Sequence, residues 1–117
     1  MIRILLISLL LTGCATMTPD EAAMWQASGN FNYKADINDE WRIYDRIDQP
    51  FEGDCEDYAL TLQKQIGGDV WFVSHRTLGP HAVLVKNHIA YDYLIGRPVS
   101  FYDYPGKFEV IINKETW

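Results

Sequence analysis

Apolar and polar positions follow two different spacings along this chain, and the spacing changes near residue 67. Before that point, apolar residues recur every three or four positions, which is the spacing of an amphipathic helix. After it, short apolar runs rich in β-branched and aromatic residues alternate with turn residues, as is typical of β-strands. The pattern predicts an α+β fold in which N-terminal helices pack on one face of an antiparallel sheet.

The first two predicted helices differ in how clearly their ends are marked. The first begins after Thr18, whose hydroxyl can cap it, and runs to about Ala27, where residues 28–30 (Ser-Gly-Asn) break it. The second covers about residues 38–47. Its apolar side would consist of Ile37, Trp41, Tyr44 and Ile47.

The third predicted helix has strong signals at both ends. Asp54 is a suitable N-cap, and Gly67-Gly68 end the helix. Its apolar stripe consists of Cys55, Ala59, Leu62 and Ile66. This helix therefore carries a cysteine at its first turn, where the positive end of the helix dipole favours a thiolate.

Strands are predicted after this helix, over residues 70–73, 81–85, 88–94, 99–104 and 108–112. The second and third of them flank Lys86-Asn87, which we interpret as a two-residue hairpin loop. Because the strands follow one another with short connections, the sequence predicts an antiparallel meander.

The N-terminus has the features of an export signal. Arg3 precedes an apolar run, residues 4–11, that is too short to cross a bilayer, since a spanning helix needs about 20 residues. The residues Leu11-Thr12-Gly13-Cys14 resemble the bacterial lipobox, in which the cysteine is lipid-modified and becomes the new N-terminus.

This resemblance predicts the domain boundaries and the location. Residues 1–13 would be a lipoprotein signal peptide, Cys14 would carry the lipid anchor, and residues 14–117 would form one domain. By resemblance to Gram-negative lipoproteins, Ala15 favours the outer membrane, so the domain is expected in the cell envelope, facing the periplasm.

The charge distribution limits the classes of partner. The net charge is −6, so nucleic acid is not an expected partner. Nine carboxylates lie between Asp36 and Asp57, against two arginines. A solvated acidic face explains such a cluster, although a basic substrate would also be favoured there. The sequence contains no phosphate-binding loop and no zinc-ligand spacing.

Three residues could form the nucleophile, base and orienting group of a cysteine hydrolase. Cys55 is left unpaired in an oxidising compartment if Cys14 carries lipid. If Lys86-Asn87 forms the hairpin loop, His81 lies directly opposite Asp92, and both side chains point to one face. The candidate catalytic residues are therefore Cys55, His81 and Asp92.

We also expect Cys55 to be a thiolate near neutral pH. The start of the helix and a protonated His81 would lower the pKa of the thiol. The neighbouring carboxylates of Asp54, Glu56 and Asp57 would raise it. We expect the first two effects to prevail, because an imidazolium would act on the sulfur at contact distance.

Three motifs resemble those of bacterial transglutaminase-like cysteine peptidases. Residues 53–60 (GDCEDYAL) resemble the nucleophile motif, residues 81–85 (HAVLV) the histidine strand, and Tyr91-Asp92 the aspartate position. The resemblance implies a papain-like fold and a protein or peptide substrate in the cell envelope. Some relatives need calcium near the nucleophile, so Asp54 and Glu56 are candidate ligands, although two carboxylates supply too few oxygens for a good site. No other cofactor is expected.

The chain also departs from this family. The interval from His81 to Asp92 is shorter than is usual, and Tyr93 follows where the family has an asparagine. The domain is close to minimal in size, which would suit a small accessory protein such as a phage-encoded one.

Alternatives remain open for both the site and the function. His75 could replace His81 as the base, Asp103 could replace Asp92, and His88 is expected at the rim on the same face as His81. The chain could be a membrane-anchored cysteine peptidase or amidase-like enzyme. It could instead be a catalytically inactive lipoprotein that binds an envelope partner. The reactivity of the Cys55 thiol separates the two.

Overall fold

The computed structural model describes residues 17–35 and 40–112; the predicted signal peptide (1–13), Cys14 and Ile37 lie outside the described residues. Within the described part, no helix is both long and apolar enough to span a membrane. The elements along the chain are helix α2 (Pro19–Asn30), strands β1 (Phe31–Tyr33) and β2 (Phe51–Gly53), helix α3 (Cys55–Ile66), strands β3 (Asp69–His75), β4 (Gly79–Lys86), β5 (Ile89–Asp92) and β6 (Arg97–Ser100), the 3₁₀ helix η1 (Phe101–Asp103) and strand β7 (Gly106–Ile112).

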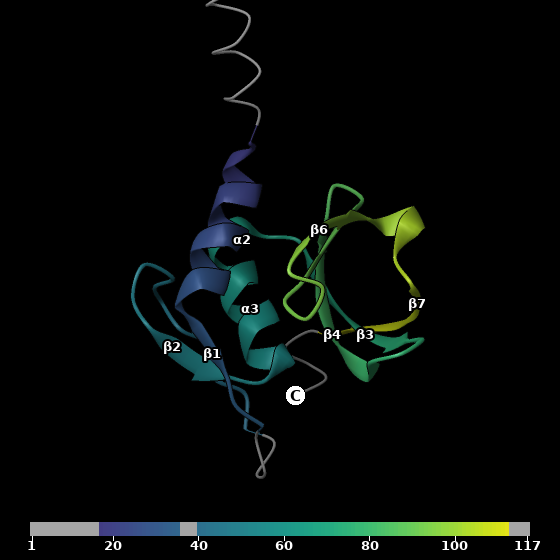
Figure 1. Ribbon diagram of the computed structural model, residues 1–117, viewed down its shortest axis with the longest axis horizontal. Coiled ribbons are helices and arrows are strands. Elements are labelled where there is room, and N and C mark those ends of the chain that lie inside the picture. Colours follow the sequence, from purple (N-terminus) through teal and green to yellow (C-terminus); the bar gives the residue numbers. More distant parts are fainter. Residues whose placement is uncertain (1–16, 36–39, 113–117) are drawn as a thin grey trace, which may run out of the picture.

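The protein has an α+β fold, which confirms the predicted class. Helices α2 and α3 lie side by side on one side of a five-stranded antiparallel sheet (Figure 1). The strand order is β6-β5-β4-β3-β7. Strands β3 to β6 form the predicted meander, but β7 returns to the far edge beside β3, so the prediction of a simple meander is wrong for the last strand.

The return of the chain to β7 curls the sheet. The segment from β6 through η1 to β7 passes in front of the sheet face that is turned away from α3, which we name the curled face (Figure 1). The rings of Phe101 and Phe108 stack across this turn, with their centroids 4.4 Å apart. This contact lies at the point where the chain turns back, and β7 pairs with β3.

The two faces of the sheet bury different cores. On the side of α3, the buried sheet residues include Val70, Ala82, Leu84 and Tyr91. On the curled face, the core contains Val73, Val83, Ala90 and Tyr104. Strand side chains alternate between faces, and His81 pairs with Val73, so the His81 side chain belongs to the curled face.

The two described helices begin where the sequence predicts. In α3, Cys55 is the first residue and Gly67 is the C-cap. In α2, the Thr18 hydroxyl accepts the Glu21 N–H at 3.1 Å, but the helix continues to Asn30, past its predicted end at Ala27. The Asn30 side-chain amide donates to the Ile47 carbonyl at 2.8 Å, which stabilises this last turn.

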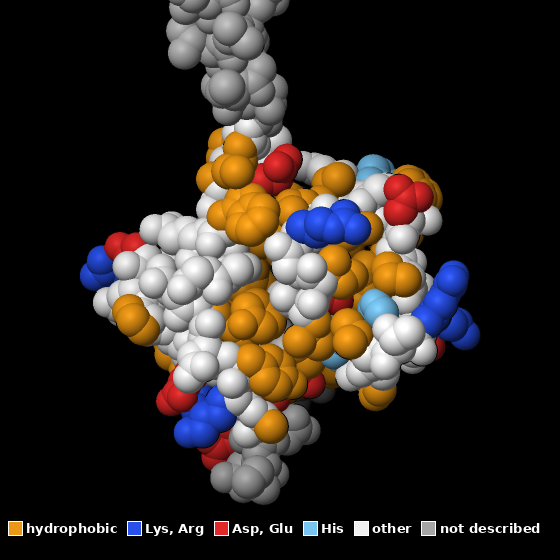
Figure 2. Space-filling model, in the orientation of Figure 1, with side chains coloured by type: hydrophobic (Ala, Val, Ile, Leu, Met, Phe, Trp, Pro, Cys, Tyr) orange, Lys and Arg blue, Asp and Glu red, His pale blue; other side chains and the backbone are white. Residues whose placement is uncertain are grey.

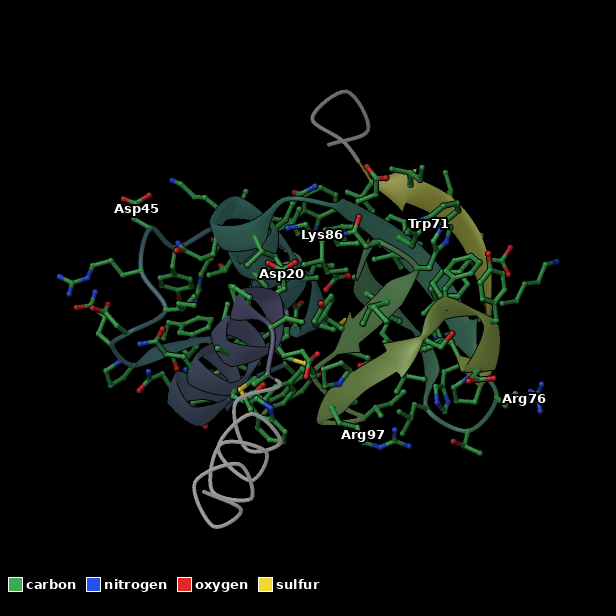
Figure 3. The ribbon with its side chains drawn as sticks, turned by 90° about the horizontal axis from the view of Figure 1, so that it is seen from above. Asp20, Asp45, Trp71, Arg76, Lys86 and Arg97 are labelled. Atoms are coloured by element: carbon green, nitrogen blue, oxygen red, sulfur yellow. The ribbon has the colours of Figure 1, made fainter. Side chains whose placement is uncertain are left out.

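An ion pair connects α2 to the sheet. Lys86 Nζ of β4 lies 2.9 Å from Asp20 Oδ2 of α2, and the two side chains point toward each other in the view from above (Figure 3). Both side chains are partly buried, at 29% and 24% exposure.

The helix predicted over residues 38–47 does not form in its described part, residues 40–47. The backbone of this segment binds α3 instead: Arg42 N–H donates to Asp57 Oδ1 at 2.5 Å, and Tyr44 N–H donates to Thr61 Oγ1 at 3.0 Å. Asp57 and Thr61 are four residues apart and therefore lie on one side of α3. The apolar spacing still identified the packed side, since Ile47 is buried and both Trp41 and Tyr44 contact the core.

A parallel pair of short strands precedes the nucleophile motif, and the sequence does not predict it. Phe31 pairs with Phe51, and Tyr33 pairs with Gly53. Lys34 N–H donates to the Gly53 carbonyl at 2.7 Å. Because Gly53 is followed directly by Asp54 and Cys55, this pairing positions the start of α3.

The hairpin between β4 and β5 turns at Asn87-His88, not at the predicted Lys86-Asn87. Lys86 pairs with Ile89 and Leu84 with Tyr91, while φ is 52° at Asn87 and 63° at His88. A type I′ turn requires positive φ at both of its central residues.

The direct opposition predicted for His81 and Asp92 is therefore wrong. The register of the hairpin, extended along β4, places Val83 opposite Asp92, so His81 and Asp92 are diagonal neighbours. Because the displacement amounts to two residues, both side chains still point to the same face.

Candidate active site

A buried histidine–carboxylate pair lies on the curled face of the sheet. His81 Nε2 and Asp92 Oδ2 are 2.6 Å apart, and the residues are 5% and 1% exposed. Strand β4 supplies His81, and Asp92 is the last residue of β5. Diagonal neighbours on adjacent strands are within reach of long side chains, which explains the contact despite the shifted register. The structure thus brings together two of the three predicted site residues.

A third side chain, Tyr104, joins this pair, and the sequence does not predict it. Tyr104 OH donates to Asp92 Oδ2 at 2.6 Å and lies 2.9 Å from His81 Nε2. Tyr104 follows η1 and is 6% exposed. Its position depends on the return of the chain to β7, which no local pattern indicates. The one signal in the sequence is a tyrosine directly before Pro105-Gly106.

Hydrogen bonds determine the charge of the pair. Burial alone would raise the pKa of Asp92, but hydrogen bonds from His81, Tyr104 and the Leu94 N–H, the last at 2.9 Å, lower it. Burial alone would lower the pKa of His81, but the hydrogen bond and charge of Asp92 raise it. Asp92 is therefore a carboxylate, and His81 is a stronger base than an ordinary histidine.

Local contacts explain why the helix starts at Cys55. Asp57 N–H donates to Asp54 Oδ1 at 3.3 Å, and Asp54 N–H donates to Asp57 Oδ2 at 3.0 Å, which forms a capping box. A side chain at Gly53 would collide with the Asp57 carboxylate, so this position requires glycine. The GDCED segment thus fixes the first turn of α3 and, with it, the place of the thiol.

The Cys55 thiol lies against the backbone of β4, at Ala82, the residue that follows His81. Ala82 N–H donates to Cys55 Sγ at 3.4 Å, and the thiol donates to Glu56 Oε2 at 3.5 Å. The pairing of β4 with β5 ends at Leu84 and Tyr91, so the edge of β4 that faces β5 has no strand partner at Ala82. The sulfur therefore contacts the peptide group that joins His81 to Ala82.

In this environment the thiol is protonated. Burial and the charge of Glu56 raise the pKa of Cys55 to about 12, and the hydrogen bond from Ala82 only partly offsets them. The expectation of a thiolate near neutral pH is therefore wrong for the free protein. The physical reason is that desolvation and a carboxylate in contact with the sulfur exceed the effect of the helix start.

Cys55 and His81 share no direct hydrogen bond within residues 17–35 and 40–112. His81 Nδ1 lies 3.1 Å from the Gly79 carbonyl oxygen on its own strand. Asp92 and Tyr104 contact Nε2 and the Gly79 carbonyl contacts Nδ1, so both ring nitrogens have partners other than the thiol. The first turn of α3 lies near His81, since Cys55 Sγ accepts the N–H of the next residue, Ala82, and the charge of Glu56 contributes to the raised pKa of His81.

The alternative site residues have other contacts. The ring of His75 lies 5.7 Å from that of His81, but its Nδ1 accepts the N–H groups of Thr77 and Leu78, each at 3.1 Å. His75 therefore holds the loop between β3 and β4. His88 is in the β4–β5 turn, where its ring stacks on Tyr102, and Asp103 is exposed on η1.

The acidic residues around the thiol interact with one another. Burial and the hydrogen bond to Asp54 raise the pKa of Glu56 to about 7. Burial likewise raises the pKa of Asp57 to about 6, despite hydrogen bonds from the backbone of Arg42 and Asp54. Over the described residues, no three carboxylate, histidine or cysteine side chains converge as metal ligands. Calcium binding by Asp54 and Glu56 stays a prediction.

Comparison with known proteins adds no family to these observations. No protein-family model matches the chain, and no curated protein matches it. The resemblance to transglutaminase-like peptidases therefore rests on the short motifs around Cys55, His81 and Asp92.

Proposed function

We propose that this protein is a membrane-anchored cysteine peptidase or amidase-like acyl-transfer enzyme of the transglutaminase-like type. Cys55 is the nucleophile, His81 the general base and Asp92 the residue that orients His81. The observation that carries the proposal is the buried 2.6 Å contact between His81 and Asp92. Ala82, which follows His81 on β4, donates its N–H to the Cys55 sulfur, so the thiol lies close to this pair along the chain. A papain-like arrangement, with the cysteine at the start of a helix against the histidine strand, is part of this proposal.

The proposed reaction forms and then cleaves a thioester. Cys55 Sγ attacks the substrate carbonyl as its proton passes to His81 Nδ1, and His81 then protonates the leaving amine as the carbon–nitrogen bond breaks. Water, deprotonated by His81, attacks the thioester carbonyl, the carbon–sulfur bond breaks, and His81 returns the proton to Cys55 Sγ as the carboxylic acid leaves. An amine in place of water gives transfer. As the first N–H of α3, the Cys55 amide has no intrahelical acceptor and can donate to the oxyanion.

The protonated thiol determines how the first step occurs. With a thiol pKa of about 12, no stable thiolate–imidazolium pair forms at rest, so proton transfer must accompany the attack. His81 Nδ1 must also exchange the Gly79 carbonyl for the thiol. The neutral, more basic His81 is then the form that promotes acylation.

Acylation of Cys55 tests the proposal. The full-length chain is treated with p-nitrophenyl acetate over a range of pH, and the acyl group on Cys55 is measured by mass spectrometry. The rate should rise as His81 deprotonates and then level off, well below the pH at which the thiol itself titrates. His81→Ala should abolish this step in the profile, whereas His88→Ala, a change in the exposed turn, should retain it.

A different profile would reject the enzyme. If the wild-type rate rises about tenfold per pH unit up to pH 10 and His81→Ala does not change it, Cys55 reacts as an ordinary buried thiol. The residues then have no catalytic relationship.

The lipid anchor and the location are a separate part of the proposal. Cys14 would carry the lipid that holds the domain at the envelope membrane, where protein or peptide substrates are found. Wild type and Cys55→Ser should both incorporate labelled fatty acid and sediment with membranes. Cys14→Ser should do neither, and an equally labelled Cys14→Ser variant would contradict the anchor.

A second candidate function is a binding lipoprotein without turnover. The observation in its favour is the thiol, whose pKa is raised to about 12 and which has no hydrogen bond to His81 in the described residues. Hydrophobic side chains also gather along the exposed face where α2 meets the strands beside it (Figure 2), and Trp25 of α2 is 49% exposed. Such a face is typical of a contact surface for a partner. An unreactive Cys55 in the acylation experiment would favour this function.

A further inference from the structure

We propose that Tyr104 is a positioning residue for the His81–Asp92 pair: its hydroxyl shares Asp92 Oδ2 with the imidazole and so limits how firmly the carboxylate holds the His81 proton. This inference rests on the proposed function, in which His81 must release and accept a proton in each cycle. It adds to that function a residue that none of the sequence motifs contains.

Three contacts define the arrangement. Asp92 Oδ2 lies 2.6 Å from both His81 Nε2 and Tyr104 OH, and the hydroxyl oxygen is 2.9 Å from Nε2. All three residues are buried, at no more than 6% exposure. One carboxylate oxygen therefore accepts two hydrogen bonds in a place with little water to replace either.

The remaining carboxylate oxygen is also occupied, because Asp92 Oδ1 accepts the Leu94 N–H at 2.9 Å. Asp92 thus cannot turn to give His81 a second oxygen without losing this bond. The aromatic ring of Tyr104 is fixed as well, by an edge contact to His75 at 5.8 Å and by Phe108 at 5.1 Å. These ring contacts hold the hydroxyl at Oδ2.

The shared oxygen has a predictable effect on His81. A hydrogen bond to a carboxylate stabilises its charged form and draws on its electron density. While Tyr104 donates to Oδ2, less of that density is available to the imidazolium. Removing the hydroxyl should therefore strengthen the bond between Asp92 and His81, and the pair should hold its proton up to a higher pH.

Several charged and titratable groups face His81, and all of them except Tyr104 must stay constant in the test. They are Asp92 from β5, Tyr104 from the segment before β7, the ring of His75 from β3 and, on α3, Glu56 and Cys55. A change confined to the Tyr104 hydroxyl leaves all of the others in place.

The experiment is an NMR titration of His81 in the full-length chain, which has only three histidines to assign. Tyr104→Phe should move the midpoint of His81 to higher pH. The control is Tyr102→Phe, which removes a hydroxyl from a side chain that is 77% exposed and should leave the midpoint unchanged. Nitrogen shifts of neutral wild-type His81 should show its proton on Nε2. A Tyr104→Phe midpoint equal to or below that of wild type would overturn the proposal, as would a proton on Nδ1.

A second replacement covers the case in which Tyr104→Phe does not fold. Site-specific difluorotyrosine at position 104 keeps the hydroxyl and makes it a stronger donor, so the His81 midpoint should fall. An unchanged or raised midpoint would overturn the proposal. The titration does not depend on enzymatic turnover, so it tests the role of Tyr104 even if the protein is inactive. If the enzyme is active but neither replacement changes the His81 midpoint, the role of Tyr104 is rejected and the proposed function is not.

Discussion

On the curled face of the sheet, Asp92 accepts hydrogen bonds from His81, Tyr104 and a backbone N–H, and its pKa is lowered although it is almost fully buried. At the start of α3, burial acts on carboxylates that lie beside one another, and the pKa of Glu56 rises to about 7, although Glu56 is less buried than Asp92. The difference lies in the neighbouring charges. At the base end of the candidate site, Asp92 accepts hydrogen bonds at both carboxylate oxygens and faces the charge of His81. At the nucleophile end, burial and the neighbouring carboxylate of Asp54 raise the pKa of Asp57, although both of its oxygens accept backbone N–H groups.

This comparison explains why the two ends of the site have opposite tendencies. The base end is arranged in advance for proton exchange, because its charges are already paired. The nucleophile end keeps the thiol neutral, because burial and, after it, the charge of Glu56 raise the pKa of Cys55. Any change that neutralises Glu56 should therefore make Cys55 more reactive, and it should also lower the pKa of His81 slightly, because the charge of Glu56 contributes to raising it.

The largest expected effect comes from breaking the base end with Asp92→Ala. This variant leaves a buried His81 without its anion, which should cost about 3–5 kcal/mol of the free energy of unfolding. The pKa of His81 should fall, because burial lowers it and the hydrogen bond and charge of Asp92 that oppose burial are lost. Urea denaturation measures the first effect and NMR titration the second. Asp103→Ala, on the exposed η1, is the control and should stay within about 0.5 kcal/mol of wild type. Equal stability of the two variants would contradict the comparison.

The next effect is the pH dependence of stability. In the folded chain the pKa is about 7 for Glu56 and about 6 for Asp57, above the ordinary values of 4.5 and 3.8. The folded state therefore binds these protons more tightly, so this contribution is full below about pH 4 and is lost as the pH rises through about 6 to 7. His81, whose pKa is also raised, acts in the same direction above 6.5.

Asp92 acts in the opposite direction, because its pKa is lowered and its contribution is lost as the pH falls below 3.8. The free energy of unfolding should therefore be highest at mildly acidic pH and should decrease from about pH 5 to about pH 8. Denaturant titrations at a series of pH values measure this slope. A free energy that increases over this range would show that the acidic residues around the thiol are not held as described.

A smaller effect, on the reactivity of the thiol, is expected when the charge of Glu56 is removed from the nucleophile end. Glu56→Gln removes the carboxylate that accepts from the Cys55 thiol, so the pKa of the thiol should fall by about one unit. Iodoacetamide should then alkylate Cys55 about tenfold faster at a fixed, mildly alkaline pH. Glu52→Gln, on β2, is the matched control and should change the rate little. Equal rates for the two variants would mean that the thiol is neutral because of burial alone.

The smallest effect concerns the capping box of α3. Asp54→Ala removes the side chain that accepts the Asp57 N–H and should cost about 1 kcal/mol of stability. Asp54→Asn can still cap the helix and should recover most of this loss, which urea denaturation would show. If both variants were destabilised equally, the charge of Asp54, and not its capping hydrogen bond, would stabilise the start of the helix.

The elements that are correct from the sequence are those fixed by neighbouring residues. Asp54 caps α3 and Gly67 ends it through contacts within a few positions, so the pattern of residues 54–67 contains the information needed. The same holds for the strand that carries His81. In contrast, residues 40–47 have a helical spacing of apolar residues but give their N–H groups to Asp57 and Thr61. These acceptors belong to α3, so no local pattern reveals them.

The candidate site shows the same division. The motifs identify Cys55, His81 and Asp92, and the structure places His81 against Asp92. Tyr104 could not be predicted, because its contact depends on how β7 returns across the curled face. The protonation of the thiol was predicted in the wrong direction, because the degree of burial at Cys55 and the orientation of Glu56 are tertiary properties.

The turn at Asn87-His88 has a consequence for how this hairpin can vary between related chains. A displacement of the β4–β5 pairing by two residues keeps Asp92 on the curled face, whereas a displacement by one residue would send its carboxylate into the apolar layer against α3. Insertions and deletions in this hairpin that alter the register should therefore be tolerated only in even steps. Odd changes should survive only with a bulge that restores the alternation before Asp92.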